Sequence, residues 1–173
     1  MADERDWVMP SGPFAGGCQC GAIRFRAEAL VDNPHICHCR MCQKATGNLF
    51  GALVGVQHEH MIWTRGTPSR FRSSEHVDRG FCANCGTPLF YHYLPGKHIS
   101  MSIGAFDHSH SIELRWQMGN EGRHPSLNGL DWIEQMGTTE EADGAESVAA
   151  IRASSNQHPD HDTIEWTAKQ STV

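Results

Sequence analysis

The chain has 173 residues, of which 39% are apolar, and a net charge of −6. This length favours a single domain with terminal additions, and no apolar run reaches the roughly 18 residues that a membrane-spanning helix needs. Residues 139–173 hold seven of the 20 acidic and two of the 14 basic residues, so they carry −5 of the net charge. Neither part has the basic stripe of a nucleic-acid binder, so we predict no nucleic-acid partner and no membrane partner.

The chain begins with a predicted flexible lead-in over residues 1–13, where charged residues mix with proline and glycine. A mostly β domain is then expected over residues 14–136. Residues 23–27 alternate apolar and basic side chains, which is typical of a half-buried strand. Further short strands are expected at 49–56, 61–63, 69–73, 77–81, 89–93, 97–103 and 112–116. Short strands separated by glycine and proline turns indicate an all-β or mostly β architecture.

The C-terminal residues 137–173 are expected to form an acidic and mostly mobile tail. Few large apolar side chains lie in this segment, so it has little with which to build a core. A short helix over 139–153 is the exception, because Ala, Glu and Arg favour helical backbone.

Seven cysteines divide into a group of three and a group of four. Cys37, Cys39 and Cys42 lie within six residues, too close for independent disulfides but suited to one zinc ion. The other four form two pairs, Cys18 with Cys20 and Cys82 with Cys85. Two pairs brought together make a closed structural zinc site, whereas three ligands leave a catalytic zinc one position for water or substrate.

Two other uses of the cysteines have less support. A secreted disulfide framework disagrees with the odd count and with the lack of an apolar signal segment, so a cytoplasmic protein is expected. Redox chemistry at Cys82 and Cys85 lacks the surrounding βαβ pattern of thioredoxin-like proteins.

The group of three suggests its own chemistry. Three thiolates give a bound zinc ion a net charge of −1, which makes it a weaker Lewis acid than zinc held by three neutral histidines. Soft ligands suit a soft fourth partner, such as an incoming thiol. The hypothesis is therefore thiol capture followed by addition to a small aldehyde.

Histidines leave an alternative open. A fourth ligand at the group of three would turn it into a second structural site. The candidates for that role are His35, His58, His60, His92, His98, His108 and His110. His38 lies inside the motif, but alternation along the chain points its ring away from the metal, so it is expected to support the ligands from outside.

Three motifs in this order resemble the glutathione-dependent formaldehyde-activating enzyme family, also named after centromere protein V. They are Gly-x-Cys-x-Cys-Gly at 16–21, Cys-His-Cys-x-x-Cys-x-Lys-x-Thr-Gly at 37–47 and Phe-Cys-x-x-Cys-Gly-Thr at 81–87. The resemblance covers roughly residues 14–132. It implies a β-tent zinc fold of short antiparallel strands with two zinc ions per chain.

The resemblance also implies roles for the cysteines and a reaction. A structural zinc would be held by Cys18, Cys20, Cys82 and Cys85, and a catalytic zinc by Cys37, Cys39 and Cys42. The implied activity is that of a carbon–sulfur lyase that joins formaldehyde to glutathione as S-hydroxymethylglutathione.

Substrate contacts are expected near the three-cysteine motif. Lys44, Arg40 and Arg65 are candidates for the carboxylates of glutathione, and Thr46 for a backbone N–H contact. The alternative for Arg40 and Arg65 is that both are solvated surface charges.

Two interpretations of function remain open at the level of sequence. The first is the zinc-dependent enzyme described above, and the second is a non-catalytic zinc module that carries glutathione or binds a protein partner. A methionine-sulfoxide reductase relative has less support, because no cysteine is spare. A homo-oligomer is compatible with all of these readings.

Overall fold

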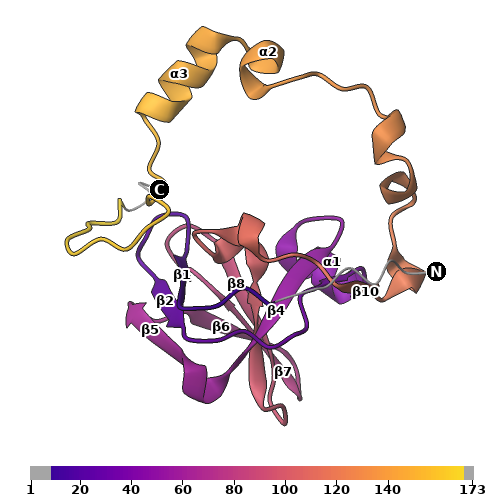
Figure 1. Cartoon of the computed structure of the whole chain (residues 1–173), viewed down its shortest axis with the longest axis vertical. Coiled ribbons are helices and arrows are strands. Elements are labelled where there is room, and N and C mark those ends of the chain that lie inside the picture. Colours follow the sequence, from indigo (N-terminus) through magenta and orange to yellow (C-terminus); the bar gives the residue numbers. More distant parts are fainter. Residues whose placement is uncertain (1–8, 170–173) are drawn as a thin grey trace.

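The computed structural model describes residues 9–169, and its body is built from β-strands (Figure 1). The strands are β1 (Phe14–Gly17), β2 (Arg24–Ala27), β3 (His35–Cys37), β4 (Gly51–Gln57), β5 (Met61–Arg65), β6 (Ser69–Ser74), β7 (Val77–Phe81), β8 (Pro88–Tyr93), β9 (His98–Ser102) and β10 (Trp116–Met118). Within the same range the α-helices are α1 (Arg40–Thr46), α2 (Thr139–Asp143) and α3 (Ala145–Ala153). The prediction of a mostly β fold is confirmed.

Two sheets share one core. The first has the strand order β1-β2-β5, and the second has the order β10-β3-β4-β9-β8-β7-β6. Neighbouring strands are antiparallel except for β10, which runs parallel to β3. Phe25 from the first sheet and Val54 and Met101 from the second are fully buried in the same apolar cluster. The Phe25 ring meets Phe106 edge to face, with 5.0 Å between centroids.

Alternation located most strands, but the predicted strand over 112–116 is wrong. The backbone is irregular from Ile112 to Arg115, and β10 begins only at Trp116. Ile112 is buried after a 3-10 turn over Ser109–Ser111, so its burial does not depend on strand pairing. Pairing starts only where the chain comes alongside β3.

The three-cysteine motif contains a helix that the sequence analysis did not foresee. Cys39 is the N-cap residue of α1, and Cys42 lies in its first turn. The helix ends at Gly47, which adopts the left-handed conformation with φ of 64°. Glycine suits this position because it lacks the Cβ that disfavours such a conformation.

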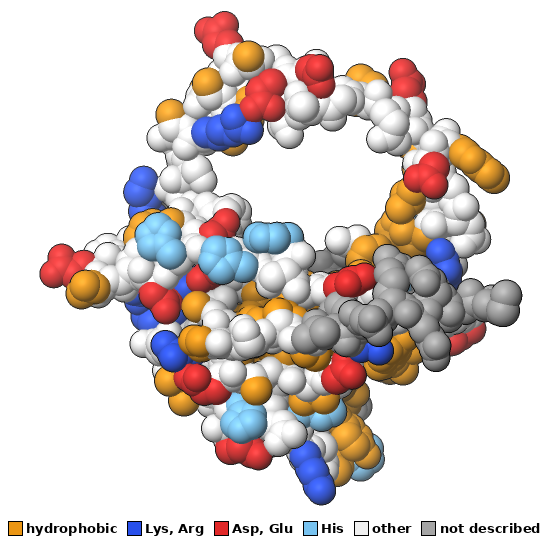
Figure 2. Space-filling model, viewed as in Figure 1, with side chains coloured by type: hydrophobic (Ala, Val, Ile, Leu, Met, Phe, Trp, Pro, Cys, Tyr) orange, Lys and Arg blue, Asp and Glu red, His pale blue; other side chains and the backbone are white. Residues whose placement is uncertain are grey.

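Beyond β10, a C-terminal arm (residues 119–156) leaves the body and carries α2 and α3 (Figure 1). The expected helix over 139–153 forms as these two helices, which are separated at Gly144. Acidic side chains are scattered along the arm (Figure 2). No described helix has both the length and the apolar character needed to cross a bilayer.

After the arm, the strap (residues 157–169) returns to the body beside β1 and β2. The Trp166 indole N–H donates to the carbonyl of Cys20 at 2.8 Å, and the His158 N–H donates to the carbonyl of Gln19 at 2.7 Å. Arg24 is 3% exposed and joins Asp162 of the strap at 2.7 Å. The boundary at residues 136/137 and the mobility of the tail stay predictions. Residues 1–8 of the expected lead-in lie outside the described residues.

Candidate metal centres and active site

The first cluster, the quartet, joins Cys18, Cys20, Cys82 and Cys85, whose sulfurs all lie within 4.8 Å of one another. The Sγ atoms of Cys18 and Cys20 are 3.6 Å apart, and those of Cys20 and Cys82 are 3.8 Å apart. Tetrahedral zinc with Zn–S bonds of about 2.3 Å needs sulfurs about 3.8 Å apart. The donor set and spacing of the quartet therefore fit zinc.

Two similar turns build the quartet. Cys18 and Cys20 lie between β1 and β2, and the other pair lies between β7 and β8. Each pair is followed by a glycine with positive φ, Gly21 at 73° and Gly86 at 77°, which reverses the chain tightly. Because one turn belongs to each sheet, the quartet is a point where the two sheets meet.

The second cluster, the trio, joins Cys37 at the end of β3 with Cys39 and Cys42. The Sγ atoms of Cys37 and Cys39 are 3.4 Å apart. All three sulfurs lie within 4.8 Å of one another, and over residues 9–169 no His, Asp or Glu ligand atom belongs to this group. The trio therefore offers zinc three sulfur donors.

The histidines nearest the trio have other contacts. His38 is 2% exposed, and its Nε2 lies 2.9 Å from Oε1 of Gln117. His35 stacks on Trp116 with 4.2 Å between centroids and has its Nδ1 2.7 Å from the carbonyl of Asn33. These rings support β10 and β3, the strands that lead into the trio.

The cysteine thiols of the two clusters differ in pKa. Burial raises the pKa of Cys37 to about 12. Burial also acts on Cys39, but hydrogen bonds from the Cys42 backbone and from Cys37 outweigh it and leave the Cys39 pKa below its ordinary value. In the quartet, burial raises the pKa of Cys18, whereas the hydrogen bonds of Thr87 overcome burial and lower the pKa of Cys85 to about 6. Binding of a metal must therefore displace protons from both clusters.

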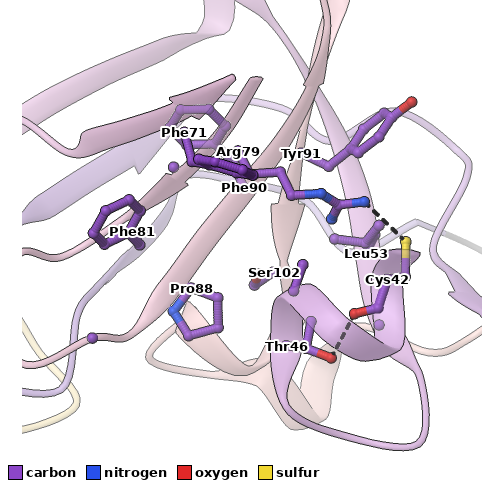
Figure 3. Close-up of a pocket in the computed structure, with 14 residues that line it drawn as sticks. Cys42, Thr46, Leu53, Phe71, Arg79, Phe81, Pro88, Phe90, Tyr91 and Ser102 are labelled. Atoms are coloured by element: carbon purple, nitrogen blue, oxygen red, sulfur yellow. Dashed lines mark hydrogen bonds between the residues drawn. The ribbon is translucent and has the colours of Figure 1, made fainter. Parts of the chain in front are cut away.

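A pocket of about 220 Å³ opens at Cys42 (Figure 3). Phe71, Phe81 and Phe90 supply much of its apolar wall. Of the described residues that line it, Arg79 alone carries a charge. The Arg79 side chain extends from β7 toward the trio, and its Nη2 donates to Cys42 Sγ at 3.6 Å (Figure 3).

Helix α1 separates the predicted substrate contacts. Cys42 and Thr46, four residues apart, share the face that lines the pocket. The Thr46 hydroxyl donates to the carbonyl of Cys42 at 2.9 Å, so it also closes the helix. Arg40 and Lys44 instead line a shallow hollow on another face, with Gln43 and Gly47.

The structure also separates Arg65 from the trio and brings in a residue that the sequence analysis missed. Arg65 lies beside the quartet and donates to the carbonyls of Gly21 and Thr163. Arg79 was counted only as part of a strand. Its alternate position with Val77 and Phe81 was a signal that it faces one side of the sheet. Nothing in the local sequence indicates that this side of the sheet lies next to Cys42.

Comparison with known proteins agrees with this geometry. The model of the family described as glutathione-dependent formaldehyde-activating enzyme matches residues 13–118, more than half of the chain. The chain belongs to this family. The matched region includes both cysteine clusters and every strand from β1 to β10, whereas the arm and the strap lie beyond it.

Individual relatives of this formaldehyde-activating family member are distant. A Schizosaccharomyces pombe protein named an uncharacterized lyase is 31% identical over 86 residues, which cover 49% of this chain and 61% of that protein. The match thus spans less than two thirds of the yeast protein. A crystal structure of a Rhodobacter sphaeroides protein aligns with a TM-score of 0.50 and 17% identity, over 59% of this chain and 98% of that one. This likeness concerns the fold alone.

Proposed function

We propose that the chain is a zinc-dependent carbon–sulfur lyase. It would add a small thiol, glutathione or a similar one, to a small aldehyde such as formaldehyde, or release it from the adduct. The observation that carries this proposal is the pocket at the trio, where Cys42 is both a member of the three-sulfur cluster and part of the pocket wall. Family membership supports the same reaction class.

The quartet would have the structural role. Cys18 and Cys82 are 3% and 1% exposed, and the two pairs come from different sheets. Zinc at this point would tie the sheets together, and zinc in small domains contributes on the order of 10–16 kcal/mol to folding.

The trio would have the catalytic role. Zinc bound there would supply a position for a substrate sulfur and favour its thiolate form. The thiolate sulfur adds to the aldehyde carbon, the C=O π pair moves to oxygen, and that oxygen takes a proton. Arg79 offsets negative charge at Cys42, and the phenylalanine wall offers the substrate an apolar surface.

Substitution of Cys42 by serine tests this division of roles, with Cys85→Ser as the matched variant in the quartet. We expect the Cys42→Ser chain to retain one zinc, its fold and its thermal midpoint, and to lose thiol-dependent aldehyde conversion. Cys85→Ser should lose the quartet zinc and lower the thermal midpoint. Retention of two zinc ions and full conversion by Cys42→Ser would contradict the proposal.

A non-catalytic role is the second candidate, favoured by the surface of the arm. Leu130, Ile133 and Met136 are more than half exposed, and Trp132 is 89% exposed. Grouped apolar side chains of this kind mark interaction surfaces. A zinc-loaded chain that binds glutathione or a protein partner but converts no aldehyde would favour a carrier or interaction module.

A further inference from the structure

We propose that the pocket at Cys42 accepts an aldehyde with an apolar body and a carboxylate, and that Arg79 determines this specificity. The inference rests on the proposed function, because it takes the trio as the reaction centre. It goes further by assigning the class of aldehyde.

The pocket is larger and more apolar than formaldehyde needs. Formaldehyde has two heavy atoms and no apolar body, whereas the pocket measures about 220 Å³ and is lined by three phenylalanine rings. Glutathione is an equally poor occupant of this space. Its carboxylates could pair with Arg79, but it also has an ammonium group, and no Asp or Glu is among the described lining residues. Pockets for larger ligands usually measure about 300–1,000 Å³. The space therefore suits a compact group on the aldehyde side of the adduct.

Arg79 has donors to spare for such a group. Its Nη2 donates to Cys42 Sγ at 3.6 Å and its Nε to Ser73 Oγ at 3.4 Å, while the guanidinium lies 5.1 Å from the centre of the Tyr91 ring. A guanidinium has five N–H donors in a rigid plane, so these bonds leave several unused. The free edge matches the two oxygens of a carboxylate.

Arg79 also differs from the buried Arg24 in the charges that surround it. Arg24 is buried against Asp107 and Asp162. Arg79 has no carboxylate partner within residues 9–169, although its side chain is partly buried and lies beside apolar rings. An unpaired charge in such a place is unfavourable unless a ligand or the trio thiolates pair with it. A ligand carboxylate supplies that partner.

The reaction balances without any further reactant. Because the guanidinium of Arg79 lies 3.6 Å from Cys42 Sγ, a short aldehyde whose carboxylate binds Arg79 would keep its carbonyl within reach of the trio. The thiolate sulfur forms the new C–S bond, the C=O π pair moves to oxygen, and one proton gives the hydroxyl of the hemithioacetal. The reverse breaks the C–S bond and returns the thiol. The carboxylate is unchanged in both directions.

A binding experiment tests the pocket apart from the chemistry. Zinc-loaded full-length chain is titrated calorimetrically with butanoate and with butanamide, neither of which reacts with thiols. Because charged hydrogen bonds are strong, we expect Arg79→Met to weaken butanoate binding about tenfold or more and to leave butanamide binding unchanged. Arg79→Lys should recover part of the loss. The control is Arg26→Met, an exposed arginine on β2 that pairs with Glu28 outside the pocket.

A substrate comparison on the unmodified chain needs no variant to fold. With glutathione as thiol, we expect kcat/KM for 4-oxobutanoate to exceed that for butanal and for formaldehyde about tenfold or more. Equal use of the three aldehydes, or unchanged butanoate affinity in Arg79→Met with its zinc intact, would overturn the inference alone. If none of the aldehydes is converted with any thiol, the proposed function fails and the aldehyde assignment fails with it.

Discussion

Trp166 is one of several contacts that hold the strap to the body near the quartet, so Trp166→Ala should weaken the docking of the strap. The indole N–H donates to the Cys20 carbonyl at 2.8 Å, and a bond of this kind contributes about 1 kcal/mol. The indole also meets the His158 ring with 4.6 Å between centroids, and aromatic pairs add about 0.5–1.5 kcal/mol. The substitution should therefore reduce the free energy of docking of the strap by about 2 kcal/mol.

Hydrogen exchange measures this loss locally. Since about 1.4 kcal/mol is a factor of ten in an equilibrium constant, the open state should become about thirtyfold more populated. We expect the amide of His158, which donates to Gln19, to exchange faster by about that factor. Zinc in the quartet should also pass faster to a competing chelator.

The matched control for this experiment is Trp132→Ala, because Trp132 is 89% exposed on the arm. Its exchange pattern around residues 157–169 should equal that of the parent chain. Equal protection of His158 in Trp166→Ala and the parent would refute the reasoning, since the indole would then contribute nothing to the docking of the strap.

Three further predictions concern packing, acidity and metal. Gly80→Ala should destabilise the fold by about 1–3 kcal/mol in denaturant titration, because its Cβ would lie 1.9 Å from the Phe90 ring. Gly104→Ala, where nothing lies within 4 Å, should have little effect. The pKa of His92 is lowered by burial and by nearby cations, so its contribution to stability is present above the unfolded pKa of about 6.5 and is lost as pH falls toward the folded value. His92→Phe should reduce this loss of stability between pH 7 and 5. A thermal midpoint that falls with pH as steeply as in the parent chain would contradict this. Zinc affinity should rise with pH, because zinc must displace the proton of Cys37, whose pKa is about 12; chelator competition at pH 6 and 8 that gave equal affinities would contradict this.

The trio was predictable from sequence because its spacing is local, whereas the quartet was inferred from two local pairs that lie more than 60 positions apart. Cys37, Cys39 and Cys42 can meet within one short segment, and alternation located strands such as β2 and β7. The helix at the motif was harder, because α1 has only seven residues. Once it forms, Lys44 is turned about 200° from Cys42, at about 100° per residue, so it lies on another face.

Contacts between distant segments could not be read from the sequence. Arg79 meets Cys42 across 37 positions, and Arg24 meets Asp162 across 138. Each depends on how the sheets and the strap come together rather than on any local pattern. The acidic composition of residues 137–173 predicted solvation, and it contained no sign that Trp166 would reach Cys20.

The arm is held to the body near its two ends. Before it, the His38 N–H donates to the Met118 carbonyl beside the trio, and after it, His158 binds Gln19 beside the quartet. Gln43 also donates to the carbonyl of Gly122 at 2.7 Å, and Arg123 donates to Gln117 at 3.1 Å, so the first residues of the arm belong to the first anchor. Beyond Arg123, the number of residues in the arm can change without moving either anchor. Each doubling of a loop's length adds only about 0.6 kcal/mol of closure entropy. The arm is therefore the natural position for inserting a reporter peptide or a second domain into this chain.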